Sequence, residues 1–483
     1  MRILMVSAEY APLAKTGGLG DAVAALAGAL SARGHEVKVV MPFYGDVDRL
    51  RYSVDRIGGL PDIPLRQGRT LHQVRLHIWR DPAGPEVCLL GNDTLYGRPG
   101  VYGYGQTGEF ADTAARQAML GAGALAVPQL LNWAPRIVHV HDAAACLALT
   151  YLACWDVSDT VLSGAGAMLT IHNLAHQSIH PRELIEQLDL PHKLAWHPGV
   201  MEFYGELNFM KAGILHADRV TTVSPTYARE VVTDPVYGCD LGDVLLDLGD
   251  RFTGIINGMD RDGWNPATDP ALPVAFSADD PTGKVACRGA LLQECGLEDG
   301  GPVLGSVGRL VHQKGYDMLT GAADDLVADG WRLVVLGTGD AELSAALGEA
   351  AARHPARVAF FDRFDEDLAR RIYAGSDAFA MPSRFEPCGL AQMYALRYGS
   401  VPVVRRTGGL ADTVPDADTT GGVGFVFDDA TPAALRACLQ RALALWHDDE
   451  AWSKLTRAGM AVEFGWDRSA AAYETLYRAL GTP

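Results

Sequence analysis

The chain has 483 residues, of which 48% are hydrophobic, and this is more than one hydrophobic core usually holds. Two domains of about 200 to 250 residues each are therefore expected. The formal net charge of −18 disfavours nucleic acid and other polyanions as partners, since most of the surface would repel them. A neutral polymer meets no such repulsion, and a few local cations can still hold a small anionic ligand.

The N-terminus and the cysteines indicate where the protein works. The chain begins Met-Arg-Ile-Leu-Met-Val-Ser-Ala-Glu, and this apolar run is too short for the core of a secretory signal. The apolar stretches 22–30 and 119–127 are shorter than the roughly 20 residues that a membrane span needs. The eight cysteines have no CxxC or metal-ligand spacing, so reduced thiols are expected. These features predict a soluble, cytoplasmic protein.

Short apolar runs, each followed by a helical pattern, recur along the chain and are typical of parallel strands buried between helices. In the first half these runs are Ile3–Val6, Val37–Met41, Ile137–Val140, Met168–Ile171 and Val220–Val223. In the second half they are Val303–Val307, Leu333–Leu336, Ala378–Met381 and Val401–Val404. The pattern predicts an α/β fold.

A hinge is expected where the two series of strands meet. The stretch 255–266 contains Asn257-Gly258 and Asn265-Pro266, which are turn signals. We therefore predict one domain over 1–254 and a second, nucleotide-binding domain over 255–465. Residues 466–483 begin with a helical pattern and are expected to join the first domain.

A glycine loop follows the first predicted strand and reads Lys15-Thr16-Gly17-Gly18-Leu19-Gly20-Asp21. It precedes a helical pattern, so backbone N–H groups and a cation can approach a diphosphate there. A tight strand-to-helix turn without a ligand would have the same features. The second half repeats the motif as Thr407-Gly408-Gly409-Leu410-Ala411-Asp412, and each copy is a candidate anion site.

The loop after the strand at Val303 contains two further cations, Arg309 and Lys314. Ordinary surface charges on a solvated loop would explain them equally well. With Lys15 they form a candidate three-cation pocket across a cleft, which can neutralise a departing diphosphate. Each close cation–anion pair contributes about 4 kcal/mol at an effective dielectric near 20, so the prediction includes no metal ion.

Carboxylate and imidazole groups stand at further predicted strand ends. The loop Pro382–Leu390 places Glu386 beside free N–H groups at a helix start, where it can accept sugar hydroxyls or simply cap the helix. Cys388 has no base nearby in the sequence and is predicted to be a packed thiol. The segments His139–Asp142 and His172-Asn173 follow two successive strands. Core histidines would explain either alone, but two strand ends converging on one cleft favour a functional site.

These segments together resemble the bacterial glycogen synthase and plant starch synthase family, which uses ADP-glucose. The likeness runs almost end to end and rests on segments 15–21, 172–175, 208–213, 222–228, 256–258, 383–390 and 405–412. The resemblance implies a GT-B fold, in which two Rossmann-like, doubly wound domains face each other across a cleft.

The resemblance also implies roles for individual residues. The donor diphosphate would be bound by Lys15, Arg309 and Lys314. The donor glucose would be surrounded by Asp142, His172, Asn257, Glu386 and the Cys388-Gly389 backbone. The aromatic ring of Tyr96 would line the donor site. The remaining donor-binding positions are Gly17, Gly18, Asn173, Phe364, Leu390, Thr407 and Gly408.

The implied reaction transfers glucose from ADP-glucose to the non-reducing end of an α-1,4-glucan such as glycogen, with retention of configuration. The acceptor's 4-hydroxyl attacks from the face that the nucleotide leaves, through an oxocarbenium-like state, and the leaving phosphate takes the proton. No covalent nucleophile and no cofactor are implied. Closure of the domains would exclude water and suppress hydrolysis of the donor.

The sequence departs from the family pattern in two places, which leaves alternatives open. The family's His-Asp-Trp-His reads His141-Asp142-Ala143-Ala144 here, so a glucan- or nucleotide-binding relative with impaired catalysis is one alternative. The family's Gly-Tyr appears as Arg363-Phe364, so a synthase that prefers UDP-glucose is another. A nicotinamide-dependent oxidoreductase is disfavoured, because the strand ending Val39–Pro42 lacks the acidic residue that would hold the ribose.

Overall fold

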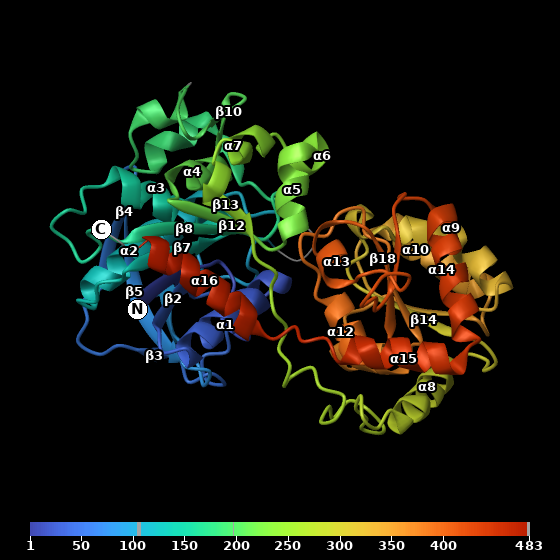
Figure 1. Cartoon of the computed structure of the whole chain (residues 1–483). Helices are drawn as coiled ribbons and strands as arrows, with labels where there is room; N and C mark the ends of the chain where they lie inside the picture. Colours follow the sequence, from blue (N-terminus) through green and yellow to red (C-terminus); the bar gives the residue numbers. More distant parts are fainter. Residues whose placement is uncertain (104–107, 197, 481–483) are drawn as a thin grey trace. The chain divides into compact units, whose positions relative to one another are not determined.

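The structure is a computed structural model that describes residues 1–103, 108–196 and 198–480 (Figure 1). It divides into two compact units, and the chain passes from unit 1 to unit 2 after Gly258, four residues beyond the predicted boundary. Unit 1 comprises Met1–Val223, Ala228–Gly258 and the residues from Trp466 onward. Unit 2 comprises Ser224–Tyr227 and Met259–Gly465.

Unit 1 is built on a sheet whose parallel part has the strand order β13-β12-β8-β7-β1-β2-β6. These strands are β1 Arg2–Val6, β2 Glu36–Pro42, β6 Glu86–Gly91, β7 Ile137–His141, β8 Gly166–Ile171, β12 Arg219–Thr222 and β13 Phe252–Gly254. All five strands predicted for the first half of the chain are present. Their side chains are almost entirely buried, as expected where helices cover both faces of a parallel sheet.

An antiparallel extension of this sheet was not predicted from the sequence. It consists of β3 Asp55–Arg56, β4 Ile63–Gln67 and β5 Thr70–Arg80, and β5 pairs with β6. A two-residue turn that begins at Gly68, with φ of +54°, joins β4 to β5. A second, three-stranded sheet contains β9 Ile179–Pro181, β10 Glu202–Phe203 and β11 Glu206–Asn208.

The helices of unit 1 pack around the large sheet. They are α1 Gly18–Ala32, α2 Thr113–Leu130, α3 Leu147–Cys154, α4 Phe209–His216, the part of α5 Pro225–Thr233 from Ala228 onward, α6 Pro235–Gly238, α7 Gly242–Leu246 and α16 Trp466–Leu480. Short 3-10 turns span Ala143–Ala145, Arg182–Gln187, His192–Ala195 and Gly249–Arg251. Helix α16, the last described element, packs against α1 and β8 (Figure 1). Residues 481–483 of the predicted C-terminal segment lie outside the described residues.

Unit 2 contains one parallel sheet with the order β16-β15-β14-β17-β18-β19. Counted along this unit, the order is 3-2-1-4-5-6, which is that of a Rossmann-like fold. The strands are β14 Val303–Val307, β15 Arg332–Leu336, β16 Val358–Phe361, β17 Ala378–Met381, β18 Val401–Arg405 and β19 Phe425–Phe427. The four strands predicted for the second half are among them, and the α/β fold with two doubly wound units is confirmed.

Helices cover both faces of the unit 2 sheet, and two hydrophobic cores lie between the helices and the sheet. One core contains Leu326 of α9, Leu347 of α10 and Leu439 of α14, and the other contains Leu291 of α8 and Ile372 of α11. The helix bounds are α8 Thr282–Cys295, α9 Tyr316–Ala328, α10 Ala341–Arg353, α11 Glu366–Gly375, α12 Ala391–Arg397, α13 Gly408–Thr413, α14 Pro432–Trp446 and α15 Asp449–Met460, with a 3-10 turn at His312–Lys314.

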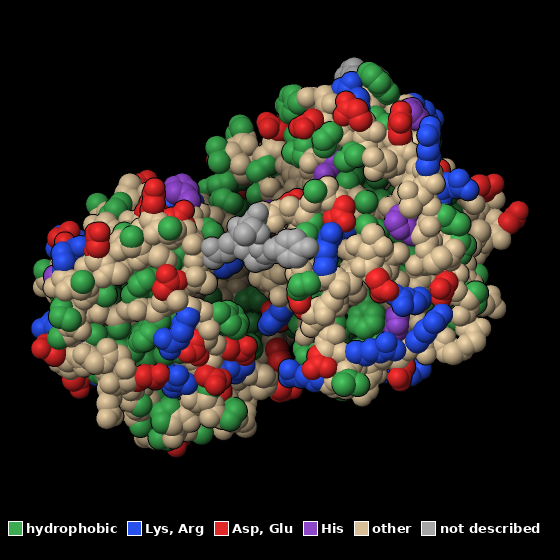
Figure 2. Space-filling view, turned by 180° about the vertical axis from the view of Figure 1, so that it is seen from behind, with side chains coloured by type: hydrophobic (Ala, Val, Ile, Leu, Met, Phe, Trp, Pro, Cys, Tyr) green, Lys and Arg blue, Asp and Glu red, His purple; other side chains and the backbone are tan. Residues whose placement is uncertain are grey.

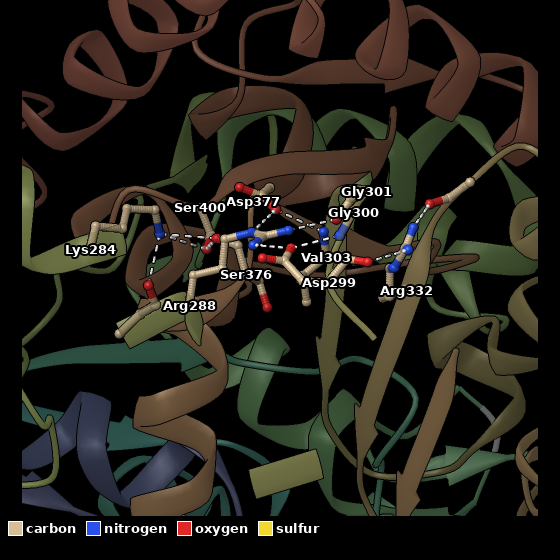
Figure 3. Close-up of polar contacts among 12 residues, drawn as sticks. Lys284, Arg288, Asp299, Gly300, Gly301, Val303, Arg332, Ser376, Asp377 and Ser400 are labelled. Atoms are coloured by element: carbon tan, nitrogen blue, oxygen red, sulfur yellow. Dashed lines mark hydrogen bonds and ion pairs between the residues drawn. The ribbon is translucent and has the colours of Figure 1, made fainter. Parts of the chain in front are cut away.

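A polar cluster fixes the amino ends of the strands in unit 2 (Figure 3). Arg288 of α8 pairs with the carboxylate of Asp377 at 3.1 Å, and the same carboxylate accepts the N–H of Val303 at 2.8 Å. Asp377 precedes β17 and Val303 opens β14, so this contact joins the starts of the two central strands. The cluster therefore lies at the opposite end of the strands from the loops that carry the predicted site residues.

Lys284 lies at one end of this cluster, where its Nζ donates hydrogen bonds of 2.9 to 3.0 Å to the carbonyls of Ala374, Ser376 and Tyr398. We expect Lys284→Met to lower the free energy of unfolding of unit 2 by about 2–4 kcal/mol, because buried carbonyls lose their donor. Urea denaturation followed by tryptophan fluorescence measures the effect. Lys454→Met, at an exposed position of α15, is the control, and equal unfolding midpoints for the two variants would contradict the role of Lys284.

Acidic, basic and hydrophobic side chains are intermingled over the face seen in Figure 2. Within the described residues, no helix is both long and apolar enough to cross a membrane.

Candidate active site

The strand order of unit 1 reverses between β1 and β7, because β2 lies beside β1 on one side and β8 lies beside β7 on the other. Ligands of open α/β sheets bind outside the carboxyl ends of strands at such a point. The glycine loop follows β1, and Asp142 directly follows β7. The predicted residues of the first half are thus brought to the position where a ligand is expected.

The glycine loop presents a cation and free backbone donors to solvent. Helix α1 begins at Gly18, so the first N–H groups of a 15-residue helix lie just after the exposed Gly17. Lys15 Nζ pairs with Asp21 of the first helical turn at 3.0 Å, and both side chains are exposed. The loop therefore has the chemistry of an anion site, because its N–H groups and its ammonium can approach a phosphate together.

Glu9, which sequence reasoning missed, anchors this loop. Its carboxylate accepts the backbone N–H of Thr16 at 2.7 Å, the Thr16 hydroxyl at 2.9 Å and the Tyr102 hydroxyl at 2.8 Å. Glu9 is almost fully buried. The only signal in the sequence was an acidic residue three positions after the end of the first predicted strand, which by itself indicates no role.

Asp142 has a strained backbone and a buried carboxyl group. Its φ of +59° and ψ of 174° lie in a region that residues other than glycine rarely adopt, and such strain is concentrated at functional sites. The carboxylate accepts the backbone N–H groups of His172 at 2.6 Å and Asn173 at 3.4 Å. Burial raises the pKa of Asp142 to about 7, against the lowering effect of these two hydrogen bonds, and the charge of Glu9 raises it further.

His172 and Asn173 follow β8 and lie against Asp142. His172 Nε2 lies 3.1 Å from Nδ1 of His141, and burial lowers the pKa of His172 to about 3, so the ring is neutral at physiological pH. The side-chain oxygen of Asn173 accepts the N–H of Ala175 at 3.1 Å, which shapes the turn. The structure thus brings Asp142, His172 and Asn173 together as predicted.

Two other predicted residues of unit 1 are buried. Tyr96 is fully inaccessible and donates its hydroxyl to the carbonyl of Arg116 at 2.6 Å, and Asn257 is also buried. Tyr96 and Ala144 both line a small cavity of about 20 Å³. That volume accommodates roughly one water molecule, beside the position where the family pattern has an imidazole.

In unit 2 the strand order reverses between β14 and β17, and the loops that follow these strands are joined by hydrogen bonds. Arg384 N–H donates to the carbonyl of Gln313 at 2.8 Å, and the Gln313 amide donates to the carbonyl of Phe385 at 3.1 Å. Gly315 has φ of +70°, and a Cβ there would lie 2.0 Å from the carbonyl oxygen of Pro382. Only glycine permits this approach.

The joined loops bring Lys314 and Glu386 into contact. Lys314 Nζ lies 2.5 Å from the Glu386 carboxylate, which also accepts the Ser383 hydroxyl at 3.1 Å. The Glu386 side chain is 6% exposed and that of Lys314 is 23% exposed. Arg309 is exposed, and none of the described residues hydrogen-bonds or pairs with its guanidinium. The loop that follows β14 therefore carries one cation paired with a buried carboxylate, Lys314, and one exposed cation, Arg309.

Glu386 does not act as a helix cap. Helix α12 begins at Ala391, its N-cap residue Leu390 makes no capping hydrogen bond, and the carboxylate of Glu386 accepts from Lys314 and Ser383. The simpler of the two interpretations of this loop is therefore wrong, since the carboxylate is directed to Lys314 instead. The carbonyls of Cys388 and Gly389 are held by the Gln392 amide at 3.1 and 3.0 Å.

The second glycine motif packs tightly on the Glu386 loop. Gly409 N–H donates to the carbonyl of Glu386 at 3.0 Å. A Cβ on Gly408, whose φ is +43°, would lie 2.0 Å from the same oxygen. Thr407 is fully buried behind this contact. The predicted residues Thr407 and Gly408 thus lie against Glu386, where they fix the loop.

Phe364 is 83% exposed, which leaves its ring free to stack on a ligand. The neighbouring Arg363 turns away from this ring, because its guanidinium pairs with Asp365 at 3.0 Å and lies over Phe361. The large cation that replaces the family's glycine is therefore engaged locally. Across the described part of the chain, no group of three or more His, Cys, Asp or Glu side chains is arranged to hold a metal ion.

Comparison with known proteins identifies the family to which the chain is similar. The sequence matches the family described as starch synthase catalytic domain over residues 2–247, and glycosyl transferases group 1 over residues 290–458. A glycogen synthase of Anaeromyxobacter dehalogenans is 46% identical over 99% of both chains. A glycogen synthase of Thioalkalivibrio sulfidiphilus is 44% identical over 99% of this chain and 100% of its own length.

Solved structures show the same relationship. The catalytic domain of starch synthase IV from Arabidopsis thaliana, bound to ADP and acarbose, superimposes with a TM-score of 0.91 at 31% identity, over 100% of this chain and 99% of that one. Sucrose-phosphate synthase from Thermosynechococcus elongatus shares the fold, with a TM-score of 0.62 at 18% identity over 99% of this chain and 98% of that one. The chain belongs to the glycogen synthase and starch synthase family of GT-B glycosyltransferases.

Proposed function

We propose that this protein is a glycogen synthase that transfers glucose from ADP-glucose to the non-reducing end of an α-1,4-glucan, with retention of configuration. The observation that carries the proposal is the Glu386–Lys314 pair at the point of unit 2 where the strand order reverses, with Arg309 exposed in the same loop as Lys314. The names of the relatives and the ADP and acarbose bound to starch synthase IV support the same donor and acceptor. We also propose that the protein acts in the cytoplasm, as expected from the sequence.

Each unit carries cations that are proposed contacts of the donor diphosphate. Arg309 and Lys314 neutralise charge that develops on the leaving phosphate, and Lys15 adds a third cation next to the N–H groups that open α1. Lys314 is already oriented by Glu386, so it needs little rearrangement to serve the phosphate.

The glucosyl group would be positioned by carboxylates and neutral polar groups. Glu386 and Asp142 accept hydrogen bonds from sugar hydroxyls. The neutral imidazole of His172 forms a further hydrogen bond with the sugar. A buried group that orients a hydroxyl contributes most when water is excluded, because the local dielectric is low. Asn173, Asn257, Leu390 and the Cys388-Gly389 backbone complete the proposed contacts.

In the proposed reaction the acceptor's 4-hydroxyl oxygen forms the new bond to the glucose C1 as the bond from C1 to the phosphate oxygen breaks. Both events occur on the same face of the sugar, which retains the α configuration. The leaving phosphate takes the proton of the attacking hydroxyl, so no side chain has to act as a base. Cys388 is buried and is not needed as a nucleophile.

The proposal is tested by analysing the product formed from ADP-glucose and glycogen. Added glucose should be released completely by an enzyme that cleaves only α-1,4 linkages at non-reducing ends. A protein that binds ADP or glycogen but extends no chain would instead be the catalytically impaired relative. Family membership leaves no support for the nicotinamide-dependent alternative.

The proposed mechanism requires neither a metal ion nor a cofactor. We expect the transfer rate to be unchanged by excess EDTA and by dialysis, because Lys15, Arg309 and Lys314 supply the charge stabilisation, about 4 kcal/mol for each close pair. Initial rates with and without EDTA and MgCl₂ measure this. A rate that falls with EDTA and returns with Mg²⁺ would contradict it.

Phe364 is proposed to stack on the nucleotide base. Phe364→Ala should raise KM for ADP-glucose by roughly 5- to 150-fold with little change in kcat, because base–aromatic stacking contributes about 1–3 kcal/mol. Val285→Ala, at another exposed apolar residue of unit 2, is the matched control and should behave as wild type. An unchanged KM in the Phe364 variant would place the base elsewhere.

A further inference from the structure

Three histidine rings lie in a row near the carboxyl ends of β7 and β8, each tilted against the next. The rings of His139 and His141 have centroids 4.2 Å apart, and those of His141 and His172 are 5.4 Å apart. Hydrogen bonds on both ring nitrogens hold His139 in place. Its Nδ1 lies 2.8 Å from the Tyr477 hydroxyl of α16, and its Nε2 lies 2.7 Å from the Thr170 hydroxyl. His141 is therefore held between a fixed ring and His172.

All three rings are neutral at physiological pH. Burial lowers the pKa of His139 and His172 to about 3, and lowers that of His141 well below its ordinary value. A neutral imidazole carries one proton, on either Nδ1 or Nε2, and the hydrogen bond made by one nitrogen decides the state of the other.

The hydrogen bond between His141 Nδ1 and His172 Nε2, 3.1 Å long, contains one proton. If His172 donated it, the proton of His141 would be on Nε2, which is buried and has no hydrogen-bond partner among the described residues. A buried N–H without an acceptor is rarer than a buried acceptor without a donor. The arrangement with the proton on His141 Nδ1 is therefore favoured, and it leaves Nε2 of His141 as a bare acceptor.

We infer that His141 is a positioning residue, which fixes the tautomer of His172 so that His172 presents Nδ1–H as a hydrogen-bond donor. His172 Nε2 accepts from His141, so its own proton must be on Nδ1. His172 is partly exposed, and no described residue forms a hydrogen bond with its Nδ1.

The peptide N–H of His172 is also held, by Asp142 at 2.6 Å, so both the backbone and the ring have fixed orientations. The inference rests on the proposed function, in which His172 contacts the donor glucose. The Nδ1–H group of His172 would donate a hydrogen bond to a sugar oxygen. This hydrogen bond would be lost if the ring adopted the other tautomer.

A pair of substitutions at His141 tests the inference. In His141→Asn the amide nitrogen stands at the same number of bonds from Cα as Nδ1, so it can still donate to His172. In His141→Leu a methyl group takes that place. We expect His141→Leu to lower kcat by about 10- to 100-fold, as loss of an orienting partner commonly does, and His141→Asn to restore most of the rate.

The control is Tyr151→Phe, which removes a buried hydrogen bond to Leu188 elsewhere in unit 1 and should leave kcat unchanged. Thermal unfolding of each variant shows whether it is folded. Equal losses in folded His141→Asn and His141→Leu, or no loss in either, would overturn the inference.

A second measurement needs no variant. In the wild-type protein labelled with ¹⁵N-histidine, the ring shifts of His172 should be those of a protonated Nδ1 and an unprotonated Nε2, and the reverse pattern would overturn the inference. His172→Ala distinguishes the proposed role of His172 from the inferred role of His141. If that variant transfers glucose at the wild-type rate, the proposed role of His172 fails. If it loses activity while the two His141 variants remain equal, only the role of His141 fails.

Discussion

Glu386→Gln is expected to lower kcat by about 10²- to 10³-fold, the cost of removing one preorganised transition-state contact. The amide has nearly the same shape as the carboxylate, but it no longer balances the charge of Lys314, which lies 2.5 Å away. The substitution therefore weakens both the contact to sugar hydroxyls and the orientation of a cation that serves the phosphate. Initial rates of ADP release over a range of ADP-glucose concentrations give kcat and KM separately.

The matched control for Glu386 is Glu349→Gln, which changes an exposed carboxylate of α10 in the same unit. Its kinetic constants should equal those of the wild type. If Glu386→Gln also retained the wild-type kcat, the buried pair with Lys314 would be structural, and the proposed site in unit 2 would be wrong.

Lys15→Ala should reduce kcat/KM for ADP-glucose by about 10²- to 10³-fold, for two electrostatic reasons. It removes a cation proposed to face the diphosphate, and it leaves Asp21 unneutralised at the start of α1, where its charge repels a phosphate. Lys15 is exposed, so its loss should change the stability of unit 1 by little.

A second substitution separates these two effects. Asp21→Asn in the Lys15→Ala background should recover part of the loss, because it removes the unpaired negative charge. Lys193→Ala, at an exposed lysine of the same unit, is the control. Wild-type kcat/KM in Lys15→Ala would show that the glycine loop does not bind the donor.

Much of the fold was predictable because parallel strands that are buried on both faces appear as continuous apolar runs. Every such run proposed from the sequence is a strand of the large sheet of unit 1 or of the sheet of unit 2. The hairpin of β4 and β5 was missed because its side chains alternate between buried and exposed, and its turn begins at Gly68 within a polar stretch. The short strand β19, Phe425–Phe427, gave too brief an apolar signal.

The candidate site was predictable residue by residue but not in its contacts. Lys314 and Glu386 are 72 positions apart, and they meet only because β14 and β17 are neighbours in the sheet. The positive φ of Asp142 has no sequence signal, since that conformation is unusual for any residue other than glycine. Glu9 was missed for a similar reason, because its three hydrogen bonds depend on how Thr16 and Tyr102 fold over it.

The central claim is tested most directly by glucose transfer to glycogen in two parallel reactions, one with ADP-glucose and one with UDP-glucose, both without added metal. Incorporation of labelled glucose into precipitated glycogen is measured over time. We predict rapid transfer from ADP-glucose and slow or no transfer from UDP-glucose. Preference for UDP-glucose would contradict the proposed donor, and absence of transfer from both donors by a folded protein would contradict the proposed activity itself.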